Sequence, residues 1–208
     1  MQIKKAAIRV GRNPEEITLV AVSKGVGQEA ILSAANAGAT VFGENRVQEA
    51  IEKFSDTTFL PPVSLHFIGS LQMNKVKKVV GFFDLIHSID SILLAEKVAE
   101  EANRQSRIQS VLVQVNIGEE AKKGGVSVKA FPQLVAAIRK HSSLSLQGVM
   151  AIPPNVKNPR PYFVRLREMS AEVGLTKLSM GMTSDFEEAI EEGATWVRIG
   201  KAIFLAPI

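Results

Sequence analysis

A lysine at the end of an apolar segment is the first group in this chain that could do chemistry. The segment Ile17–Lys24 is apolar over most of its length and closes on Lys24. If Val20 and Val22 face the inside of a barrel, the period of two in a strand directs Lys24 into the barrel mouth. Partly apolar surroundings would remove water from the ammonium and make the amine available for a Schiff base. The alternative is a lysine that leaves the strand into solvent.

A turn near the C-terminus offers groups that bind an anion. Hydroxyls and a glycine precede a predicted helix, and the residues concerned are Ser179, Gly181, Thr183 and Ser184. Unpaired amides and the positive end of a helix dipole converge at such a turn, which favours a phosphate. Serine and threonine at these positions are also typical of ordinary helix caps, so this turn alone does not identify a ligand.

A second turn of this kind follows the last predicted strand. Gly200 lets the backbone approach a phosphate, and Arg198, two residues earlier, lies on the same face of the strand. Lys201 adds a cation directly after the glycine. Together with Lys24 and the preceding turn, this arrangement favours a ligand that carries a phosphate.

Two further polar residues reach the same mouth in this interpretation. Asn45 follows a predicted strand, and His66 lies within another. A histidine in an apolar strand is more typical of a hydrogen-bonded core residue than of a ligand, and neither His87 nor His141 shows metal-ligand spacing with it. The chain contains no cysteine, which excludes thiolate zinc sites, iron–sulfur clusters and thiol nucleophiles.

Apolar patterning supplies the elements that must position these groups, as eight strands that alternate with seven helices. The strands are predicted at Ile17–Lys24, Thr40–Asn45, Ser64–Ser70, Phe83–Asp90, Gln109–Ile117, Leu144–Ile152, Lys177–Thr183 and Thr195–Phe204. The helices are predicted at Gln28–Ala37, Arg46–Phe54, Asn74–Gly81, Ser91–Gln105, Val128–His141, Pro161–Val173 and Phe186–Glu192. Glycines at 38, 174 and 193 are expected just past helix ends, and Asp90 and Asp185 are expected to cap the helices after them.

An α/β barrel fits this alternation best. Eight strand–helix units share 208 residues, about 26 each, which is near the smallest repeat that a strand and a crossover helix allow. We therefore predict one domain over residues 1–208, a single (β/α)8 TIM barrel with its functional groups at the carboxyl ends of the strands. An open doubly wound sheet is the main alternative, but Gly25 and Gly27 lack the third glycine of its phosphate-binding motif.

Composition limits the partners of the chain. The 25 Lys and Arg exceed the 21 Asp and Glu by 4, and 46% of the residues are hydrophobic. The locally basic stretch Lys75–Lys78 is typical of a solvated helix face, so no nucleic acid partner is predicted. Residues 1–12 lack the apolar core of a secretory signal, and no apolar run is long enough to cross a bilayer. We expect a cytoplasmic protein with no membrane partner.

The motifs occur in an order that resembles one known family. They are Ala21-Val22-Ser23-Lys24, Phe42-Gly43-Glu44-Asn45, His66-Phe67-Ile68-Gly69, Ser179-Met180-Gly181-Met182 and Val197-Arg198-Ile199-Gly200. This set resembles the pyridoxal 5′-phosphate homeostasis protein family over nearly the whole chain. The resemblance implies a barrel like the N-terminal domain of alanine racemase. It also implies that the chain binds pyridoxal phosphate covalently, as members of this family do without an established turnover.

The resemblance also implies roles for individual residues. Lys24 becomes the Schiff-base lysine, and Arg198 faces the pyridine nitrogen. The residues implied around the phosphate are Ser179, Gly181, Thr183, Ser184, Gly200 and Lys201, and those implied near the mouth are Asn45 and His66. The chain departs from the family pattern at Arg46, Thr183, Lys201 and Leu205. Lys201 replaces a usual threonine, so an ammonium stands where a hydroxyl contact to phosphate is expected.

Three functions compete on this basis. The favoured one is a carrier or buffer of pyridoxal phosphate that contacts cofactor-dependent apo-enzymes transiently and works as a monomer. An arginine at the pyridine nitrogen leaves the ring unprotonated and a poor electron sink, which suits binding better than catalysis. The enzymatic alternative is a racemase of low activity or a Schiff-base aldolase for a phosphosugar. The third is binding of a polyanion through the basic surface.

Overall fold

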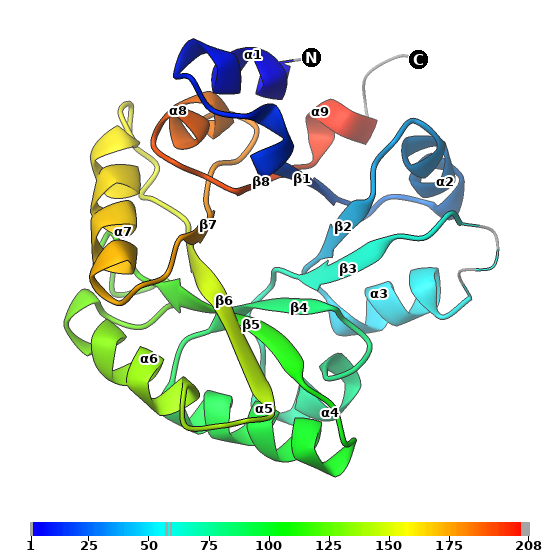
Figure 1. The fold of residues 1–208 in the computed structure, drawn as a ribbon. Coiled ribbons are helices and arrows are strands. Elements are labelled where there is room, and N and C mark those ends of the chain that lie inside the picture. The colour runs from blue at the N-terminus through cyan, green and yellow to red at the C-terminus, as the bar shows by residue number, and fades with distance from the viewer. Residues whose placement is uncertain (1, 57, 59, 205–208) are drawn as a thin grey trace.

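Eight parallel strands close into a barrel in the computed structural model, which describes residues 2–56, 58 and 60–204 (Figure 1). The strands are β1 (Thr18–Val22), β2 (Val41–Glu44), β3 (Ser64–Phe67), β4 (Leu85–Ile89), β5 (Gln109–Val115), β6 (Leu144–Ala151), β7 (Lys177–Ser179) and β8 (Trp196–Ile199). Each strand pairs with the next, and β8 pairs with β1 in a register that runs from Thr18 opposite Trp196 to Ala21 opposite Ile199. The predicted (β/α)8 barrel is confirmed, and the open sheet is excluded.

Helices alternate with the strands and form a ring around them (Figure 1). They are α1 (Gln2–Arg9), α2 (Gln28–Asn36), α3 (Val47–Phe54), α4 (Val76–Val79), α5 (Ile92–Arg104), α6 (Phe131–Ile138), α7 (Arg160–Glu172), α8 (Phe186–Glu191) and α9 (Lys201–Phe204), with short 3-10 turns η1 (Pro14–Glu16), η2 (Met73–Lys75) and η3 (Val128–Ala130). The seven predicted helices match α2 to α8 to within a few residues, except that α4 and α6 are preceded by η2 and η3.

The prediction that the last strand runs from 195 to 204 is wrong in its second half. Strand β8 ends at Ile199, and α9 begins two residues later. Ile203 and Phe204 are partly buried against the hydrophobic core from outside the barrel, so their apolar character reflects helix packing. Leu205 lies outside the described residues.

The N-terminal helix α1 was not predicted. Ala6 and Ala7 are fully buried, and Arg9 donates hydrogen bonds to Glu187 and Glu191 of α8. Figure 1 shows α1 beside α8, across the junction between the last and first strands. The helix therefore covers the seam where the barrel closes.

Three predicted helix ends, each followed by a glycine, are confirmed. The residues after α2, α7 and α8 have φ values of +100°, +69° and +103°, and these residues are Gly38, Gly174 and Gly193. Only glycine adopts this left-handed conformation without strain, so each one stops its helix at the predicted place.

The two aspartate caps turn out differently. Asp90 does not cap α5, because Ser91 is the cap residue and its side chain accepts from the Leu94 amide. Asp185 does stand at the N-cap position of α8, but its side chain accepts no hydrogen bond from that helix. Its carboxylate accepts instead from the Met182 amide at 2.6 Å, so it closes the turn before the helix.

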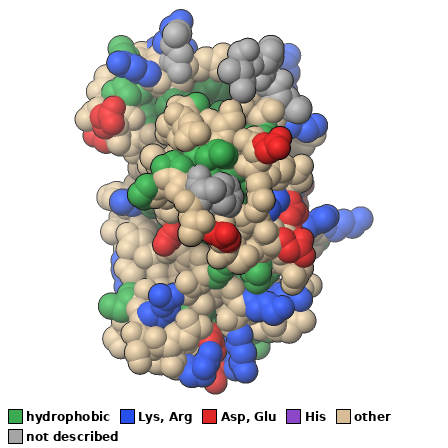
Figure 2. Space-filling view, turned by 90° about the vertical axis from the view of Figure 1, so that its right-hand side faces the viewer, with side chains coloured by type: hydrophobic (Ala, Val, Ile, Leu, Met, Phe, Trp, Pro, Cys, Tyr) green, Lys and Arg blue, Asp and Glu red, His purple; other side chains and the backbone are tan. Residues whose placement is uncertain are grey.

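On the face of the molecule shown in Figure 2, neither positive nor negative side chains dominate the surface. Basic and acidic side chains are interspersed there with small hydrophobic areas. No helix among the described residues is long and apolar enough to cross a membrane.

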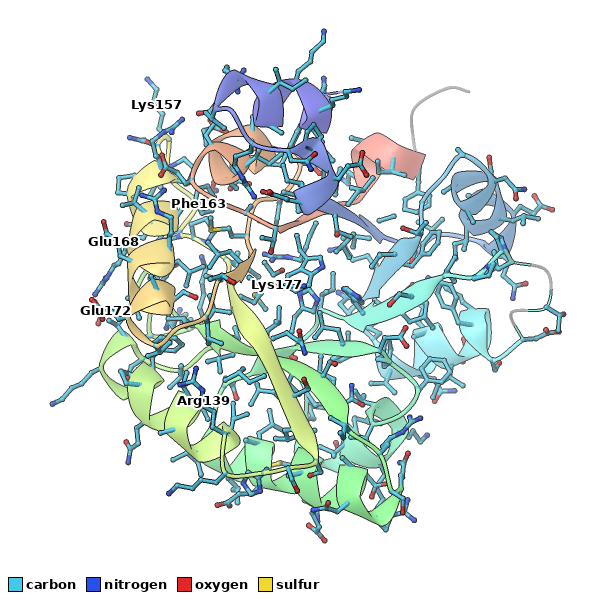
Figure 3. All side chains as sticks on the ribbon, in the orientation of Figure 1. Arg139, Lys157, Phe163, Glu168, Glu172 and Lys177 are labelled. Atoms are coloured by element: carbon cyan, nitrogen blue, oxygen red, sulfur yellow. The ribbon has the colours of Figure 1, made fainter. Side chains whose placement is uncertain are left out.

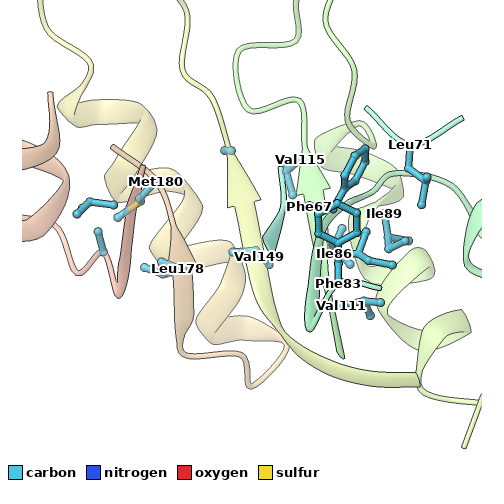
Figure 4. Close-up of a cluster of buried hydrophobic side chains, with 14 of the residues drawn as sticks. Phe67, Leu71, Phe83, Ile86, Ile89, Val111, Val115, Val149, Leu178 and Met180 are labelled. Atoms are coloured by element: carbon cyan, nitrogen blue, oxygen red, sulfur yellow. The ribbon is translucent and has the colours of Figure 1, made fainter. Parts of the chain in front are cut away.

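Two apolar layers hold the barrel together. The larger lies between the strands and the surrounding helices, where Figure 4 shows Phe67, Phe83 and Ile86 packed together. The smaller fills the barrel itself and consists of Val20, Val41, Leu85, Leu112, Met150 and Trp196. Burial of one such side chain stabilises a protein by about 1.5–3 kcal/mol, so both layers stabilise the barrel that carries the site.

Lys177 lies beside the inner layer at the end of the barrel where the strands begin (Figure 3). Its ammonium lies 5.2 Å from the centre of the Trp196 ring, a distance at which a cation and an aromatic face attract each other. The polar residues of the candidate site belong to the opposite half of the strands.

Candidate functional site

Four polar side chains from four strands meet inside the barrel. They form what we call the interior network, which consists of His66 on β3, His87 on β4, Ser179 on β7 and Arg198 on β8. All four are buried, with His87 and Ser179 fully so. Parallel strands direct every second side chain inward, and the inner apolar layer supports these four from one side.

Hydrogen bonds link the interior network in a chain. Arg198 Nη1 donates to Ser179 Oγ at 2.7 Å, because a guanidinium only donates. Ser179 Oγ is also hydrogen-bonded to His87 Nδ1 at 2.9 Å, and His87 Nε2 is hydrogen-bonded to His66 Nδ1 at 3.0 Å. The donor in each of these two bonds depends on the histidine tautomer. The tautomers of the two histidines are therefore coupled, since one of the two facing ring nitrogens must donate and the other accept.

Burial sets the charges of the network. It lowers the pKa of His66 to about 4 and that of His87 well below its ordinary value of 6.5, with Arg198 adding repulsion for His87. Burial also lowers the pKa of Arg198, to about 10, while Asp185 opposes this change electrostatically. Near neutral pH both histidines are uncharged and the arginine is a cation.

Neutral oxygens hold the guanidinium of Arg198. Its Nη1 also donates to the Ser179 carbonyl at 2.7 Å, and its Nη2 donates to the Ala151 carbonyl at 3.0 Å. Among the described residues no carboxylate lies within ion-pair distance of it. A buried cation without a paired anion is costly unless hydrogen-bonded, so this arginine is oriented firmly and keeps its charge for a ligand.

Lys24 lies at the rim, in the turn after β1. The inward position predicted for Val20 is confirmed, because Val20 belongs to the inner layer. Val22 lies two residues further along the same strand and is adjacent to Gly200. The expected desolvation of Lys24 is wrong for this structure, since the residue is exposed. The reason is local: the backbone turns at Lys24 and Gly25 and carries the side chain beyond the apolar part of the strand.

Asn45 contributes an unpaired acceptor close to the strand ends. Its Oδ1 is buried and has no hydrogen-bond partner among the described residues. The backbone of Asn45 packs tightly against Gly69. A Cβ added to Gly69 would lie 2.2 Å from the Asn45 carbonyl oxygen. The position is therefore rigid, and its free amide oxygen is suited to a ligand donor.

The two predicted anion turns are joined by a backbone hydrogen bond. The Arg198 amide donates to the Gly181 carbonyl at 2.9 Å. Gly181 has φ +88°, and a Cβ on it would lie 2.5 Å from the Ala189 Cβ, so glycine is required for close packing on α8. Gly200 is less constrained, since a Cβ there would meet the Val22 carbonyl at 3.4 Å.

The remaining residues at these turns are open to solvent. Together with Lys24 they form what we call the rim groups, which are Lys24, Thr183, Ser184 and Lys201. Ser179 was expected with them, but its hydroxyl is buried and engaged with Arg198 and His87. Ser179 therefore binds the Arg198 guanidinium inside the barrel and does not belong to the solvent-exposed anion turn.

Sequence reasoning missed two parts of this region. It considered His87 only as a metal ligand, although alternation from Leu85 in β4 places this histidine inside the barrel. It also gave no role to three charged residues beside the Lys24 turn, namely Glu44, Glu49 and Lys53. An acid at the end of an apolar strand and an acid–lysine pair four residues apart were the available signals.

Known proteins share this barrel. The sequence profile of the family described as alanine racemase, N-terminal domain, matches residues 5–207. The structure aligns with an alanine racemase of Clostridium difficile at a TM-score of 0.76, over 97% of this chain and 54% of the racemase. The two are only 14% identical, which shows a shared fold. The class is therefore the alanine racemase N-terminal-domain barrel.

Closer relatives define the family within that class. A pyridoxal phosphate homeostasis protein of Aquifex aeolicus is 43% identical over 98% of this chain and 92% of its own length. The structure of PipY from Synechococcus elongatus with pyridoxal phosphate bound aligns at a TM-score of 0.86 with 34% identity, over 98% of this chain and 100% of PipY. This chain belongs to the pyridoxal phosphate homeostasis protein family, as the resemblance of its motifs predicted.

Proposed function

We propose that this protein binds pyridoxal phosphate as a Schiff base on Lys24 and holds it for delivery to other proteins, without turnover. The buried, neutrally anchored guanidinium of Arg198 is the observation that carries the proposal. Support also comes from PipY, whose structure contains this cofactor, and from the names of the relatives. That the protein acts in the cytoplasm and as a monomer stays a prediction.

The residues present fit the chemistry of this cofactor. Its pyridine nitrogen accepts hydrogen bonds, and Arg198 is a firmly oriented donor. Its phosphate needs exposed donors, which Thr183, Ser184 and Lys201 supply at neighbouring turns. The unpaired Oδ1 of Asn45 can accept from a hydroxyl on the ring.

Each residue has a distinct task in this proposal. Pyridoxal phosphate supplies an aldehyde and a ring that accepts electrons when its nitrogen is protonated. Lys24 would hold the group covalently through its side-chain nitrogen, which would take the place of the aldehyde oxygen with loss of water. Arg198 remains cationic near neutral pH, because its pKa of about 10 is well above that range. Its charge disfavours a proton on the neighbouring nitrogen.

The absence of turnover follows from that charge in our proposal. An unprotonated ring stabilises carbanions poorly, which weakens racemase chemistry. Exposed rim groups also give the cofactor a direct way out to solvent, which suits delivery. A steady rate of amino-acid racemisation by the loaded protein, above that of free cofactor, would favour the enzymatic alternative instead.

Reduction with borohydride tests the covalent link. The protein is incubated with pyridoxal phosphate, reduced, and digested for mass mapping, with Lys24→Ala and Lys177→Ala treated alike. We expect a visible absorbance band and a reduced adduct on Lys24 in the natural protein and in Lys177→Ala, since Lys177 lies at the opposite end of the barrel. Lys24→Ala should show neither. A reducible adduct that persists in Lys24→Ala would refute the assignment.

A further inference from the structure

A partly buried ammonium, that of Lys53, contacts the turn that carries Lys24. Lys53 Nζ on α3 donates to the Ser23 carbonyl at 2.7 Å and to Glu44 Oε1 at 3.0 Å. It also donates to Glu49 Oε1 at 2.5 Å. One side chain thus joins the end of β1, the end of β2 and the first turn of α3.

The same two carboxylates bind the backbone and side chain on both sides of Lys24. Ser23 Oγ donates to Glu44 Oε1 at 2.7 Å, and the Gly25 amide donates to Glu49 Oε1 at 2.5 Å. Lys24 is therefore flanked by two anchored residues. Gly25 has φ +69°, the left-handed conformation that lets the chain turn here.

The three charged side chains of this cluster are largely shielded from solvent. Glu44 is fully buried, and the side chains of Lys53 and Glu49 are 12% and 24% exposed. Burial raises the pKa of Glu44, whereas the hydrogen bond from Lys53, followed by that from Gly25, lowers the pKa of Glu49. Placing charges at such depth contributes little to stability, so a role in fixing local structure is the better explanation.

We propose that Lys53 is a positioning residue that holds the Lys24 turn in the conformation needed to bind a carbonyl ligand. The proposal rests on the function proposed above for Lys24. A flexible turn would have to be ordered each time a ligand binds, and that cost weakens binding. The cluster removes this cost in advance, because Ser23 and Gly25 are already fixed by groups from two other elements.

Hydrogen exchange tests the structural half of the proposal without any ligand. Lys53→Met keeps the length of the side chain but loses its charge and its three donors. The matched control is Lys97→Met, which removes an exposed lysine paired with Glu100 on α5. We expect the Gly25 amide to exchange at least about tenfold faster in Lys53→Met, on the scale of one lost hydrogen bond to a charged group, and unchanged in Lys97→Met.

Titration with pyridoxal phosphate tests the functional half. Lys53→Met should weaken binding about tenfold or more, and Lys53→Arg should recover part of the loss, because a guanidinium still donates to the same oxygens. Glu49→Gln gives a milder second variant if Lys53→Met does not fold, and it should also weaken binding and speed exchange at Gly25. Unfolding measured for each variant separates these changes from general destabilisation.

The outcomes are distinguishable. If the natural protein forms no adduct on Lys24, the proposed function fails and the functional half of this proposal fails with it. If the adduct forms but the folded Lys53 and Glu49 variants bind as the natural protein does, only the role of Lys53 is overturned. Faster exchange together with weaker binding, confined to these variants, supports it.

Discussion

The interior network and the rim groups hold polar side chains in opposite ways. Inside the barrel the four residues are buried, and hydrogen bonds link them in a chain from Arg198 to His66. At the rim the residues are exposed and lie in turns or, for Lys201, at the start of α9. Preorganised groups recognise a ligand without reordering, whereas exposed groups can exchange with solvent.

The difference teaches how one site can both recognise and release a ligand. In the proposed function, the rigid interior recognises the ring through Arg198. Attachment and phosphate binding belong, in the same proposal, to the open rim, where Lys24 and Ser184 lie. If this division is correct, substitutions in the interior should change stability most, and substitutions at the rim should change binding with little effect on stability.

Arg198→Asp should have the largest effect. The new carboxylate would face the carbonyl oxygens of Ser179 and Ala151 that the guanidinium now satisfies. We expect a loss of about 3–5 kcal/mol in the free energy of unfolding, as for an uncompensated buried charge. Urea unfolding measures it, with Arg139→Asp as control, since Arg139 is exposed on the outer side of the barrel (Figure 3). Equal losses of unfolding free energy in Arg198→Asp and Arg139→Asp would contradict the contrast between a rigid interior and an open surface.

The second-largest expected effect is a loss of folding stability at acid pH. The folded pKa of His66, about 4, is below its ordinary value of 6.5, so the unfolded chain binds the proton more readily. Stability is fully present above the ordinary value and is lost as the pH falls toward 4, by about 1 kcal/mol per pH unit for one histidine.

Comparison with His66→Gln isolates this effect. Glutamine keeps an acceptor for His87 but does not titrate. Raised pKa values of Glu44, Asp90 and Asp185 act in the opposite direction and are common to both proteins, so they cancel in the difference. We expect a flatter stability profile below the ordinary histidine pKa in the variant. Parallel profiles would show that His66 is not held neutral.

Gly181→Ala should give a smaller loss at the junction of the two regions. Its Cβ would lie 2.5 Å from that of Ala189, in addition to the strain of φ +88°. Gly174→Ala is the matched control, because Gly174 has φ +69° but nothing near its missing Cβ. We expect Gly181→Ala to cost about 1–3 kcal/mol more than the control in thermal or urea unfolding. Equal costs would mean that α8 shifts freely.

Ser184→Ala should have the smallest effect on stability. An exposed hydroxyl at the rim contributes within about 0.5 kcal/mol to folding. Loss of a bond to a phosphate should nevertheless weaken pyridoxal phosphate binding about tenfold. Ser142→Ala, an exposed serine before β6 at the other end of the barrel, should change neither. Unchanged binding in Ser184→Ala would remove this serine from the phosphate site.

Sequence alone was sufficient for the barrel and for the rim turns. Buried parallel strands are apolar on both faces, which made all eight visible, and glycines marked three helix ends correctly. The end of β8 was misjudged because Ile203 and Phe204 are as apolar in a short packed helix as they would be in a strand. Apolar patterning reports burial, not the direction in which the chain continues.

The interior network could not be derived in the same way. Which inward residues meet depends on the stagger between strands, and no single strand records that stagger. His87 reaches both His66 and Ser179 because four strands bring them to one level. The role of Lys53 likewise depends on how α3 docks against the end of β1.

Pairing of the first strand with the last has a consequence for biosynthesis. Lys24 follows β1, while Arg198 lies in β8 opposite Val20, so these two residues of the proposed site are separated by most of the chain. Contacts this distant in sequence form only when the last strand is available, which slows folding. A nascent chain that still lacks β8 therefore has an open barrel, and the proposed site is completed only after nearly the whole polypeptide has been synthesised.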